Sequence, residues 1–409
     1  MNVERTDIII IGGGLLGTAI AYQLACRTTK KIVLLERHDI ASQATSRAAC
    51  LLTKARTKYV SMQMVQETYD CILRLENELG ESLDLQQVGS VSIASSAESL
   101  QNLNELATSE TSLNIQNEWI SNSKVQDLLP WICTNDVLGA LYMPTDAYID
   151  SAQLCNGYAK AAKQRGVTLR THTSVKELMV ENKQIVGVRL TNNDELHAPI
   201  VINAAGSWSN FLSFPHGDGL PMTPVRSHFW ISESNENQFP KQQPFVILPD
   251  ARAFTRPDVG ALIIGIREPD CVAFNPETLP DNIDQVEWSN DNGWSTLAST
   301  SKDFTKYYPD FNNLGIAHYV AGPSCYVPDG MFVIGKSEKT NGLFHATGCC
   351  GGGVAASGGI GRLVAEQVLN EETFVDASFF NPMRFGEINP FDEIFQQQCA
   401  NARSNKKGG

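Results

Sequence analysis

The feature that most constrains this chain is a glycine motif near its N-terminus. The run Asp7–Ile11 is short and β-branched, which is typical of a buried parallel strand. Gly12, Gly14 and Gly17 follow in the spacing G-x-G-x-x-G, and the apolar segment 18–25 predicts a helix after them. We therefore predict a strand–turn–helix unit whose glycines let a pyrophosphate approach the backbone at the helix N-terminus.

A carboxylate stands at the distance that such a unit requires. A second apolar strand, Ile32–Leu35, ends at Glu36, about 20 residues beyond the glycines. A carboxylate there accepts hydrogen bonds from ribose hydroxyls and repels a 2′-phosphate, so FAD or NAD is favoured over NADP. The motif itself does not separate FAD from NAD.

Composition limits the class of partner. The 409 residues are 42% hydrophobic and 19% charged, and the formal net charge is −13. This length suggests two or three domains, at roughly 150 residues each. The negative charge disfavours nucleic acid and anionic membranes and favours a small-molecule partner. The apolar run Ile8–Ile11 is too short for a signal peptide or a membrane span, which predicts a cytoplasmic location.

The cysteines predict reduced thiols and no metal site. Ten cysteines are scattered without the paired CxxC or His spacing of a zinc site. Cys349 and Cys350 are adjacent, and adjacent residues fit disulfide geometry poorly. We interpret these two as small apolar side chains in a tight loop.

Several segments resemble FAD-dependent oxidoreductases of the D-amino-acid oxidase superfamily. The group most similar is that of the dimethylglycine and sarcosine dehydrogenases and the glycine and sarcosine oxidases. The stretches 41–50 and 198–209 are similar to the family's small-residue segment and its returning strand. Residues 322–335 are similar to its GP-x-x-x-x-PDG-x-x-x-x-G signature. The resemblance covers nearly the whole chain and implies FAD as the cofactor.

A second glycine-rich segment, 346–366, continues the family's pattern. It has the composition of a strand, a glycine loop and an apolar helix. Such a loop lets N–H groups and a helix N-terminus approach the N1–C2=O edge of a reduced flavin, which gains negative charge. The alternative is a close-packed helix start beside a sheet. Motif and resemblance together assign the following residues to FAD: Gly12, Gly14, Leu15, Leu16, Gly17, Glu36, Arg37, Ser46, Arg47, Ala48, Ala49, Val175, Ala204, Ala205, Gly206, Trp208, Gly330, Gly348, Gly351, Gly352, Gly353 and Val354.

The predicted fold class is α/β, or α+β overall. A Rossmann-like FAD-binding domain would combine residues 1–85, 145–220 and 322–385, and an antiparallel-sheet substrate domain would combine 86–144 and 221–321. Short strands separated by Asn-containing turns predict a β-meander within 175–197. The polar tail 401–409 is predicted to be disordered. Substrate should bind where the two domains meet.

The resemblance implies oxidation of the C–N bond of a small amino acid or N-alkylated amino acid by hydride transfer to flavin N5. The protein then needs a cation for the substrate carboxylate and a His or Tyr for orientation or proton uptake. His228, Arg256 and Tyr326 are our catalytic candidates, with Arg226 and Arg252 as weaker ones. Oxidation of a 2-hydroxy acid, or a role as the flavin subunit of a larger complex, stays open.

The chain departs from the dehydrogenases at two positions. Arg47 stands where they carry a flavin-linked His in a WHAAG segment, so no histidyl link is expected there. Their HQY segment reads Ser227-His228-Phe229, which moves His228 to the opposite strand face if no bulge compensates. The apolar stretch 261–265 replaces a lysine of monomeric sarcosine oxidases and favours a dehydrogenase. The acceptor, whether oxygen, a quinone or a partner flavoprotein, stays open.

Overall fold

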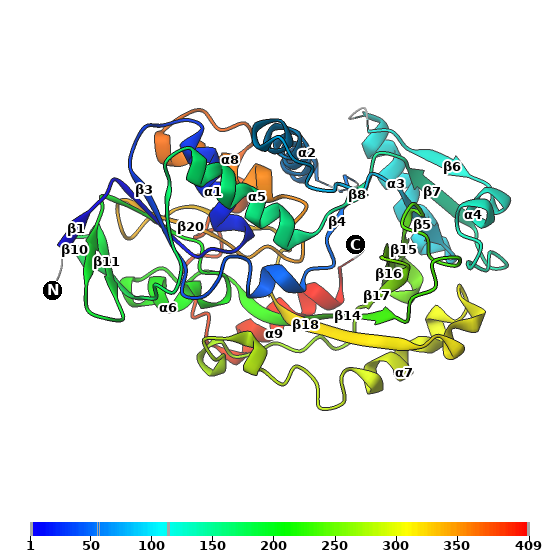
Figure 1. The fold of residues 1–409 in the computed structure, drawn as a ribbon. Coiled ribbons are helices and arrows are strands. Elements are labelled where there is room, and N and C mark those ends of the chain that lie inside the picture. The colour runs from blue at the N-terminus through cyan, green and yellow to red at the C-terminus, as the bar shows by residue number, and fades with distance from the viewer. Residues whose placement is uncertain (1–2, 55, 57, 113–114, 407–409) are drawn as a thin grey trace.

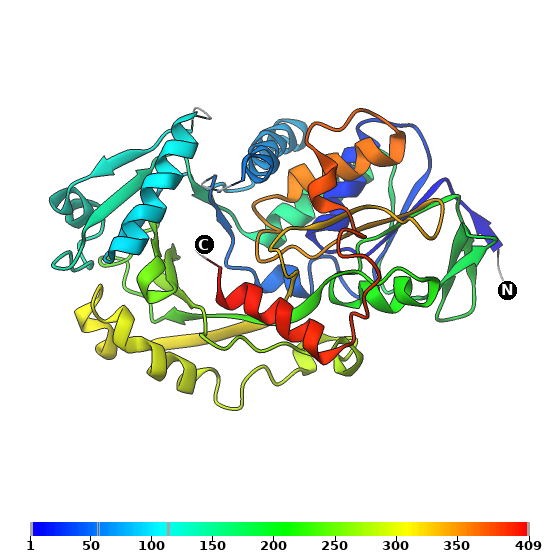
Figure 2. The ribbon, with the colours of Figure 1, turned by 180° about the vertical axis from the view of Figure 1, so that it is seen from behind.

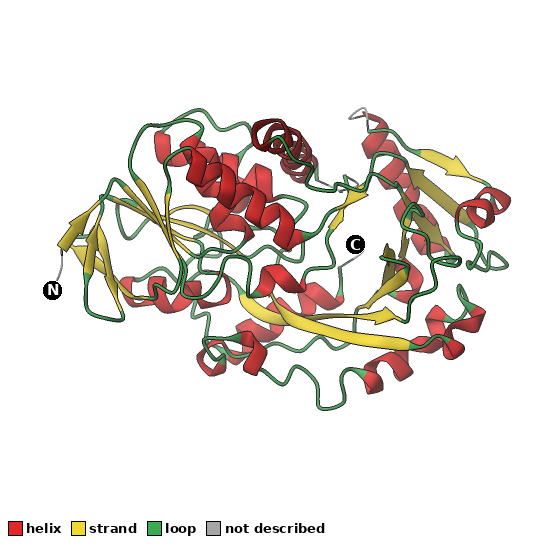
Figure 3. Cartoon of the chain, in the orientation of Figure 1, coloured by secondary structure: helices red, strands yellow, loops and turns green. Residues whose placement is uncertain are grey.

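Two large sheets divide the molecule. The computed structural model describes residues 3–54, 56, 58–112 and 115–406. Figure 1 shows one sheet beneath a group of helices that includes α1, α5 and α8, and the other at the opposite end beside α3, α4 and α7. Figure 3 shows that each of the two sheets has helices packed beside it. The predicted α/β class is confirmed.

The first sheet has six strands in the order β19-β20-β13-β2-β3-β9. At its centre β2 (Ile8–Ile11) pairs in parallel with β3 (Ile32–Leu35) and β13 (Ile200–Asn203). These strands are apolar on both faces because helices cover one face and a smaller sheet covers the other. The outer strands are β9 (Thr168–Arg170), β20 (Leu343–Thr347) and the antiparallel edge strand β19 (Val333–Lys336).

The smaller sheet has four strands in the order β1-β12-β11-β10. It contains the predicted meander: β10 (Val175–Glu181), β11 (Gln184–Leu190) and β12 (Glu195–His197) are antiparallel neighbours. The N-terminal strand β1 (Val3–Arg5) pairs in parallel with β12. Leu178, Val188 and Leu196 pack with residues of β2, β3 and β13 in one apolar cluster.

The second large sheet has eight strands in the order β18-β14-β17-β16-β15-β5-β7-β6. It is antiparallel as predicted, except that β15 and β5 pair in parallel. Its strands are β5 (Ser90–Ala94), β6 (Glu118–Ile120), β7 (Gly139–Met143), β14 (Thr223–Ser232), β15 (Phe245–Leu248), β16 (Ala253–Asp258), β17 (Ala261–Ile266) and β18 (Ile316–Tyr326). A two-stranded ribbon of β4 (Leu51–Leu52) and β8 (Ala147–Tyr148) completes the sheets.

One predicted domain boundary falls inside a strand. The boundary at residue 322 lies within β18, which pairs with β14 from Ile316 to Tyr326 and therefore belongs to the eight-stranded sheet along its whole length. The other boundaries stay predictions. The helices are α1 (Leu15–Ala25), α2 (Tyr59–Leu79), α3 (Ala97–Ser112), α4 (Asn122–Leu128), α5 (Ser151–Gln164), α6 (Ser209–Ser213), α7 (Trp294–Phe304), α8 (Ser357–Leu369) and α9 (Glu393–Ser404). In the described ranges no helix is long and apolar enough to cross a bilayer.

Glycines at the start of α8 let three helices pack closely. A Cβ atom on Gly361 would lie 2.8 Å from the carbonyl oxygen of Ala19 in α1, and one on Gly359 would lie 2.5 Å from that of Met64 in α2. Close packing therefore accounts for the glycines within α8. The glycines before residue 357 form the preceding loop.

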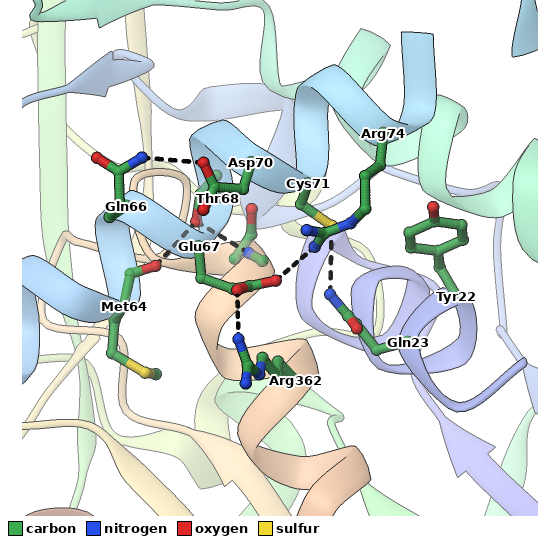
Figure 4. A network of polar contacts seen from close by, with 12 residues as sticks. Tyr22, Gln23, Met64, Gln66, Glu67, Thr68, Asp70, Cys71, Arg74 and Arg362 are labelled. Carbon is green, nitrogen blue, oxygen red and sulfur yellow. Dashed lines mark hydrogen bonds and ion pairs between the residues drawn. The ribbon is translucent and has the colours of Figure 1, made fainter. Parts of the chain in front are cut away.

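A network of charged side chains fastens α2 to α8, as Figure 4 shows. The buried Glu67 carboxylate accepts a hydrogen bond from Arg362 Nη1 at 2.8 Å and forms an ion pair with Arg74. Arg362 Nε also donates to Glu366 Oε1 at 2.6 Å. The Thr68 hydroxyl accepts a hydrogen bond from the Gly358 N–H at 3.0 Å, which fixes the first turn of α8.

The predicted disorder of 401–409 is wrong for the residues up to Ser404. Asp392 caps α9, and the helix continues through Ser404. Its buried residues, Gln396, Cys399, Ala400 and Arg403, recur at helical spacing, so a segment that is polar in composition packs by one face. Figure 2 shows α9, in red, lying along β18. Residues 407–409 lie outside the described residues.

We predict that Glu67→Gln lowers the free energy of unfolding by about 2 kcal/mol. The substitution removes the buried carboxylate that pairs with Arg74 and Arg362, and both arginines are partly exposed. Urea unfolding measures the change. Glu81→Gln removes the exposed pair with Lys160 and should change stability by less than about 0.5 kcal/mol. Equal effects of the two substitutions would contradict the role of the network.

Candidate functional site

A cavity of about 650 Å³ runs along the carboxyl edge of the six-stranded sheet and reaches the eight-stranded sheet. Residues at the ends of β2, β3, β13 and β20 line it on one side, and residues of β16, β17 and β18 line it on the other. The edge where parallel strands end is the usual binding crevice of such sheets.

The N-terminal glycines create an open approach at this edge. Gly12 has a φ of +109°, and a Cβ atom there would overlap the carbonyl oxygen of Ala204 in the strand-end loop after β13. A Cβ atom on Gly17 would overlap the carbonyl oxygen of Gly12, so helix and loop touch through backbone. A Cβ atom on Gly14 would meet only the Thr45 hydroxyl, at 3.3 Å. The space above Gly14 therefore suits a phosphate group.

Glu36 holds the glycine loop and faces the cavity. Its Oε2 accepts a hydrogen bond from the Gly13 N–H at 2.6 Å, and its Oε1 accepts one from the His38 N–H at 2.7 Å. The Arg37 guanidinium stacks 3.9 Å from the ring centroid of Trp208. The indole Nε1 of Trp208 is buried and has no hydrogen-bond partner among the described residues.

The middle of the cavity is walled by the 3₁₀ turn η1 (Ala44–Arg47) and the residues after it. Arg47 forms an ion pair with Asp284 and donates to the carbonyl oxygen of Gln43 at 3.1 Å, so it ties η1 to the loop that carries Asp284. Ser46 is exposed, and its hydroxyl donates to the same carbonyl at 2.9 Å.

The second glycine loop closes the cavity near the eight-stranded sheet. The Gly351 N–H donates to the Ser324 hydroxyl at 3.1 Å. A Cβ atom on Gly351 would lie 2.8 Å from the Tyr326 hydroxyl oxygen and 3.4 Å from Lys406 Nζ. Glycine at this position, which has a φ of +73°, therefore lets both polar groups come up to the loop.

Cations gather at this end of the cavity. Arg267 follows β17, Arg403 lies in the last turn of α9, and Lys406 lies just beyond that helix. All three line the cavity, as does Arg56. Arg403 Nε donates to the carbonyl oxygen of Arg226 at 2.7 Å, and Lys406 Nζ donates to that of Cys350 at 3.2 Å. Burial lowers the pKa of Arg267 to about 10. Burial, reinforced by Arg56 and Arg267, lowers the pKa of Lys406 to about 7.

The three catalytic candidates have different surroundings. Tyr326 lines the cavity, and burial raises the pKa of its hydroxyl. Arg256 is not among the residues that line the cavity: its Nε donates to the carbonyl oxygen of Ala49 at 2.7 Å and its Nη1 to Asp258 at 2.8 Å. These bonds give Arg256 a structural task at the junction of β16 with the segment after η1.

His228 packs inside an aromatic cluster. Its side chain is fully buried, its Nδ1 lies 3.1 Å from the Tyr319 hydroxyl, and its ring lies 4.8 Å from that of Trp230. The pairing of β14 with β18 has no bulge between Thr223 and Ile231, so His228 shares a strand face with Trp230. The residues of β14 that line the cavity are Ser227, His228 and Phe229. Burial lowers the pKa of His228 to about 3, so the ring is neutral beside Glu268.

One comparison with known proteins establishes the family, because the match spans most of the chain. The model of the family described as FAD dependent oxidoreductase matches residues 7–367. The chain belongs to this family.

Among curated relatives, the mouse (Mus musculus) mitochondrial pyruvate dehydrogenase phosphatase regulatory subunit is 27% identical, with 94% of this chain and 44% of that protein covered. The 4-methylaminobutanoate oxidase (formaldehyde-forming) of Paenarthrobacter nicotinovorans is 26% identical over 92% of this chain and 45% of that protein. The chain thus spans less than half of the length of these relatives. Sarcosine and dimethylglycine dehydrogenases and glycine oxidase also match, which confirms the resemblance inferred from the motifs.

Solved structures show the same fold. The crystal structure of L-proline dehydrogenase from P. horikoshii superposes with a TM-score of 0.82 at 23% identity, covering 93% of this chain and 98% of that chain. This likeness confirms the predicted Rossmann-like fold with its second, antiparallel sheet.

The residues present fit the FAD of this family. The space above Gly14, the buried Glu36 carboxylate and the unpartnered Trp208 Nε1 suit a phosphate, a ribose and a polar acceptor of the ligand. Most of the residues predicted to contact FAD line the cavity: Gly12, Gly14, Leu15, Leu16, Glu36, Arg37, Arg47, Ala48, Ala49, Val175, Ala204, Ala205, Gly206, Trp208, Gly351, Gly353 and Val354.

Five predicted FAD contacts do not line the cavity. They are Gly17, Ser46, Gly330, Gly348 and Gly352, and their contact with FAD stays a prediction. A Cβ atom on Gly348 would lie 2.8 Å from Val333 Cγ2, and the Gly352 N–H donates to the carbonyl oxygen of Cys349 at 2.7 Å. All ten cysteines are free thiols, and no cluster of metal-ligating side chains occurs within the described ranges.

Sequence reasoning missed the cations at the end of the cavity beside the eight-stranded sheet. Arg267, Arg403 and Lys406 were not among the candidates, and 401–409 was assigned to a disordered tail. The helical spacing of Gln396, Cys399, Ala400 and Arg403 was the available signal, because it places an arginine on the same helix face as the small residues Cys399 and Ala400.

We predict that Glu36→Ala lowers the affinity for FAD by about 10- to 100-fold, because hydrogen bonds to a charged group contribute about 1.5–3 kcal/mol. The ratio of flavin absorbance to protein absorbance after gel filtration measures retention. Glu181→Ala, at an exposed position in β10, is the matched control and should retain FAD. Full retention by Glu36→Ala would contradict the assignment.

We predict that His228 makes the fold sensitive to acid. Because its pKa is lowered to about 3, the unfolded chain takes up the proton first as pH falls below about 6.5, so stability is lost between these two pH values. At pH 5 the loss from this group is about 2 kcal/mol. His228→Gln should therefore lose less stability than the parent protein between pH 7.5 and pH 5 in urea unfolding. The same loss in both proteins would contradict a buried neutral ring.

Proposed function

We propose that this chain oxidises the C–N bond of a small amino acid or N-alkylated amino acid, with hydride transfer to N5 of FAD. The observation that carries the proposal is the single cavity that joins the two glycine loops to a group of cations. The loops suit the cofactor, and the cations suit the carboxylate of an amino-acid substrate.

FAD, when bound, supplies the hydride acceptor. The chain's own residues position the substrate. Arg267, at the end of β17, presents a guanidinium that can hold a carboxylate through two parallel hydrogen bonds. Phe254 and Ile266 line the cavity nearby and exclude water from the reacting bond.

The cations also help to keep the substrate amine unprotonated. A positive field lowers the pKa of an amine, because the ammonium form is repelled. Arg267, Arg403 and Lys406 supply such a field. The neutral amine is the form that can release a hydride from its α-carbon, so these residues favour the reactive form as well as binding the acid group.

The names of several relatives support this class of reaction. One is a 4-methylaminobutanoate oxidase and another is a glycine oxidase from Bacillus subtilis (strain 168), of which this chain covers 95% at 24% identity. Both names describe oxidation of an amino or methylamino acid. The electron acceptor stays open; the apolar β17, with Ile263 and Ile264 buried, favours an acceptor other than oxygen.

A second candidate is a flavin subunit of a larger assembly. The observation in its favour is the similarity to a phosphatase regulatory subunit across 94% of the chain. Anaerobic addition of sarcosine, proline, glycine, N-methylated amino acids, D-amino acids and 2-hydroxy acids to the holoprotein distinguishes these candidates. Bleaching of the flavin supports the amine oxidoreductase. Bleaching only by 2-hydroxy acids would transfer the proposal to those substrates, and a flavin that no compound reduces would favour the assembly role.

We predict that Arg267→Met raises the KM for an amino-acid substrate by about 10- to 100-fold, because it removes a charge-assisted contact of about 1.5–3 kcal/mol. Arg267→Lys keeps the charge but not the planar pair of donors, so it should recover only part of the loss. Steady-state kinetics with flavin content matched between variants measures the effect. An unchanged KM in Arg267→Met would exclude this residue from carboxylate binding.

A further inference from the structure

The cavity holds more positive charge at its substrate end than a simple amino acid requires. One guanidinium suffices for one carboxylate. Arg267 fills that requirement, yet Arg403 and Lys406 line the same end. Both belong to α9 or to the residues just after it. This segment begins at Glu393, 26 residues beyond residue 367, where the family match ends.

The two additional cations, Arg403 and Lys406, both line the cavity. The Arg403 guanidinium lies 5.8 Å from the centroid of the Tyr326 ring, and Nε is held by the carbonyl oxygen of Arg226. Lys406 Nζ lies beside the second glycine loop, 3.4 Å from the position that a Cβ atom on Gly351 would take. Among the described residues its one hydrogen bond is the one to Cys350, whereas a lysine ammonium carries three donors.

Among the described residues, carboxylates balance this group only in part. Of the described residues that line the cavity, only Glu36 and Asp281 are acidic, and both lie at the nucleotide end, where they bind Gly13 and Arg37. Glu268, next to Arg267 in the chain, forms an ion pair with Arg226 and also interacts electrostatically with Arg403. This one carboxylate is therefore shared between two arginines. The field at the substrate end is therefore positive.

We propose that the substrate carries two anionic groups, as an amino acid or N-alkylated amino acid with a second carboxylate does. Arg267 binds one carboxylate, and Arg403 with Lys406 binds the other. This inference rests on the proposed function and specifies its substrate class. The lowered pKa of Lys406 agrees with it, because a bound anion would favour the charged ammonium that the neighbouring arginines disfavour.

The test uses binding of compounds that the flavin cannot oxidise. Malonate and succinate serve as dicarboxylates, and acetate and butyrate serve as monocarboxylates. Their dissociation constants for the holoprotein are measured from the change in the visible flavin spectrum. We expect at least one dicarboxylate to bind about tenfold or more tightly than the monocarboxylates, since a charge-assisted hydrogen bond contributes about 1.5–3 kcal/mol.

Substitution locates the second contact. Lys406→Gln should weaken dicarboxylate binding about tenfold and leave monocarboxylate binding within about threefold, whereas Lys406→Arg should keep the preference. Lys302→Gln, at an exposed position in α7, is the matched control and should change neither.

Equal weakening of both kinds of ligand would overturn the proposal, because Lys406 would then act on the flavin or on the first carboxylate. If neither malonate nor succinate bound the parent protein more tightly than acetate and butyrate, the proposal would be overturned without any variant, even where Lys406→Gln fails to retain flavin. Dicarboxylate preference in a protein whose flavin no amino acid reduces would keep the second anion site and reject the proposed reaction.

Discussion

The backbone contact between the N-terminal glycine loop and its neighbours determines the rest of the site. Gly12 lies against the carbonyl oxygen of Ala204, and Gly17 lies against that of Gly12. These contacts are possible only because β2 stands between β3 and β13 at the centre of a parallel sheet. The loop is thereby fixed at the carboxyl edge, and the cavity follows that edge toward the second sheet.

Charge is divided along this cavity. Glu36 and Asp281 lie at the end suited to the nucleotide, where the carboxylate of Glu36 also secures the glycine loop through Gly13. Arg267 and Lys406 lie at the end suited to the substrate. Interactions between charges are stronger in a partly dehydrated cavity than in water, so this separation orients an elongated ligand as well as binding it.

The sequence predicted those parts of the site that depend on local pattern. G-x-G-x-x-G spacing, a carboxylate after the second strand and a glycine loop before a helix each follow from short-range geometry, and Gly14, Glu36 and Gly353 all line the cavity. The strand that carries His228 has no bulge between Thr223 and Ile231, which is the condition that the sequence set for the face of His228; that this face is opposite to the one used in the dehydrogenases stays a prediction.

Residues whose roles depend on long-range packing could not be predicted in this way. Arg256 is a cation in the eight-stranded sheet, but its Nε donates to the carbonyl oxygen of Ala49, which is distant in sequence. Arg403 stands in a segment of polar composition, and only the packing of α9 against β14 and β18 buries it. Burial of a cation is costly unless an anion or an oriented dipole offsets the lost hydration. Carbonyl oxygens offset part of that cost at Arg403 and Lys406, through Arg226 and Cys350. An anion that enters the cavity reduces the remaining repulsion among the cations. Because folding has already brought these cations together, an anionic ligand binds without the cost of assembling them.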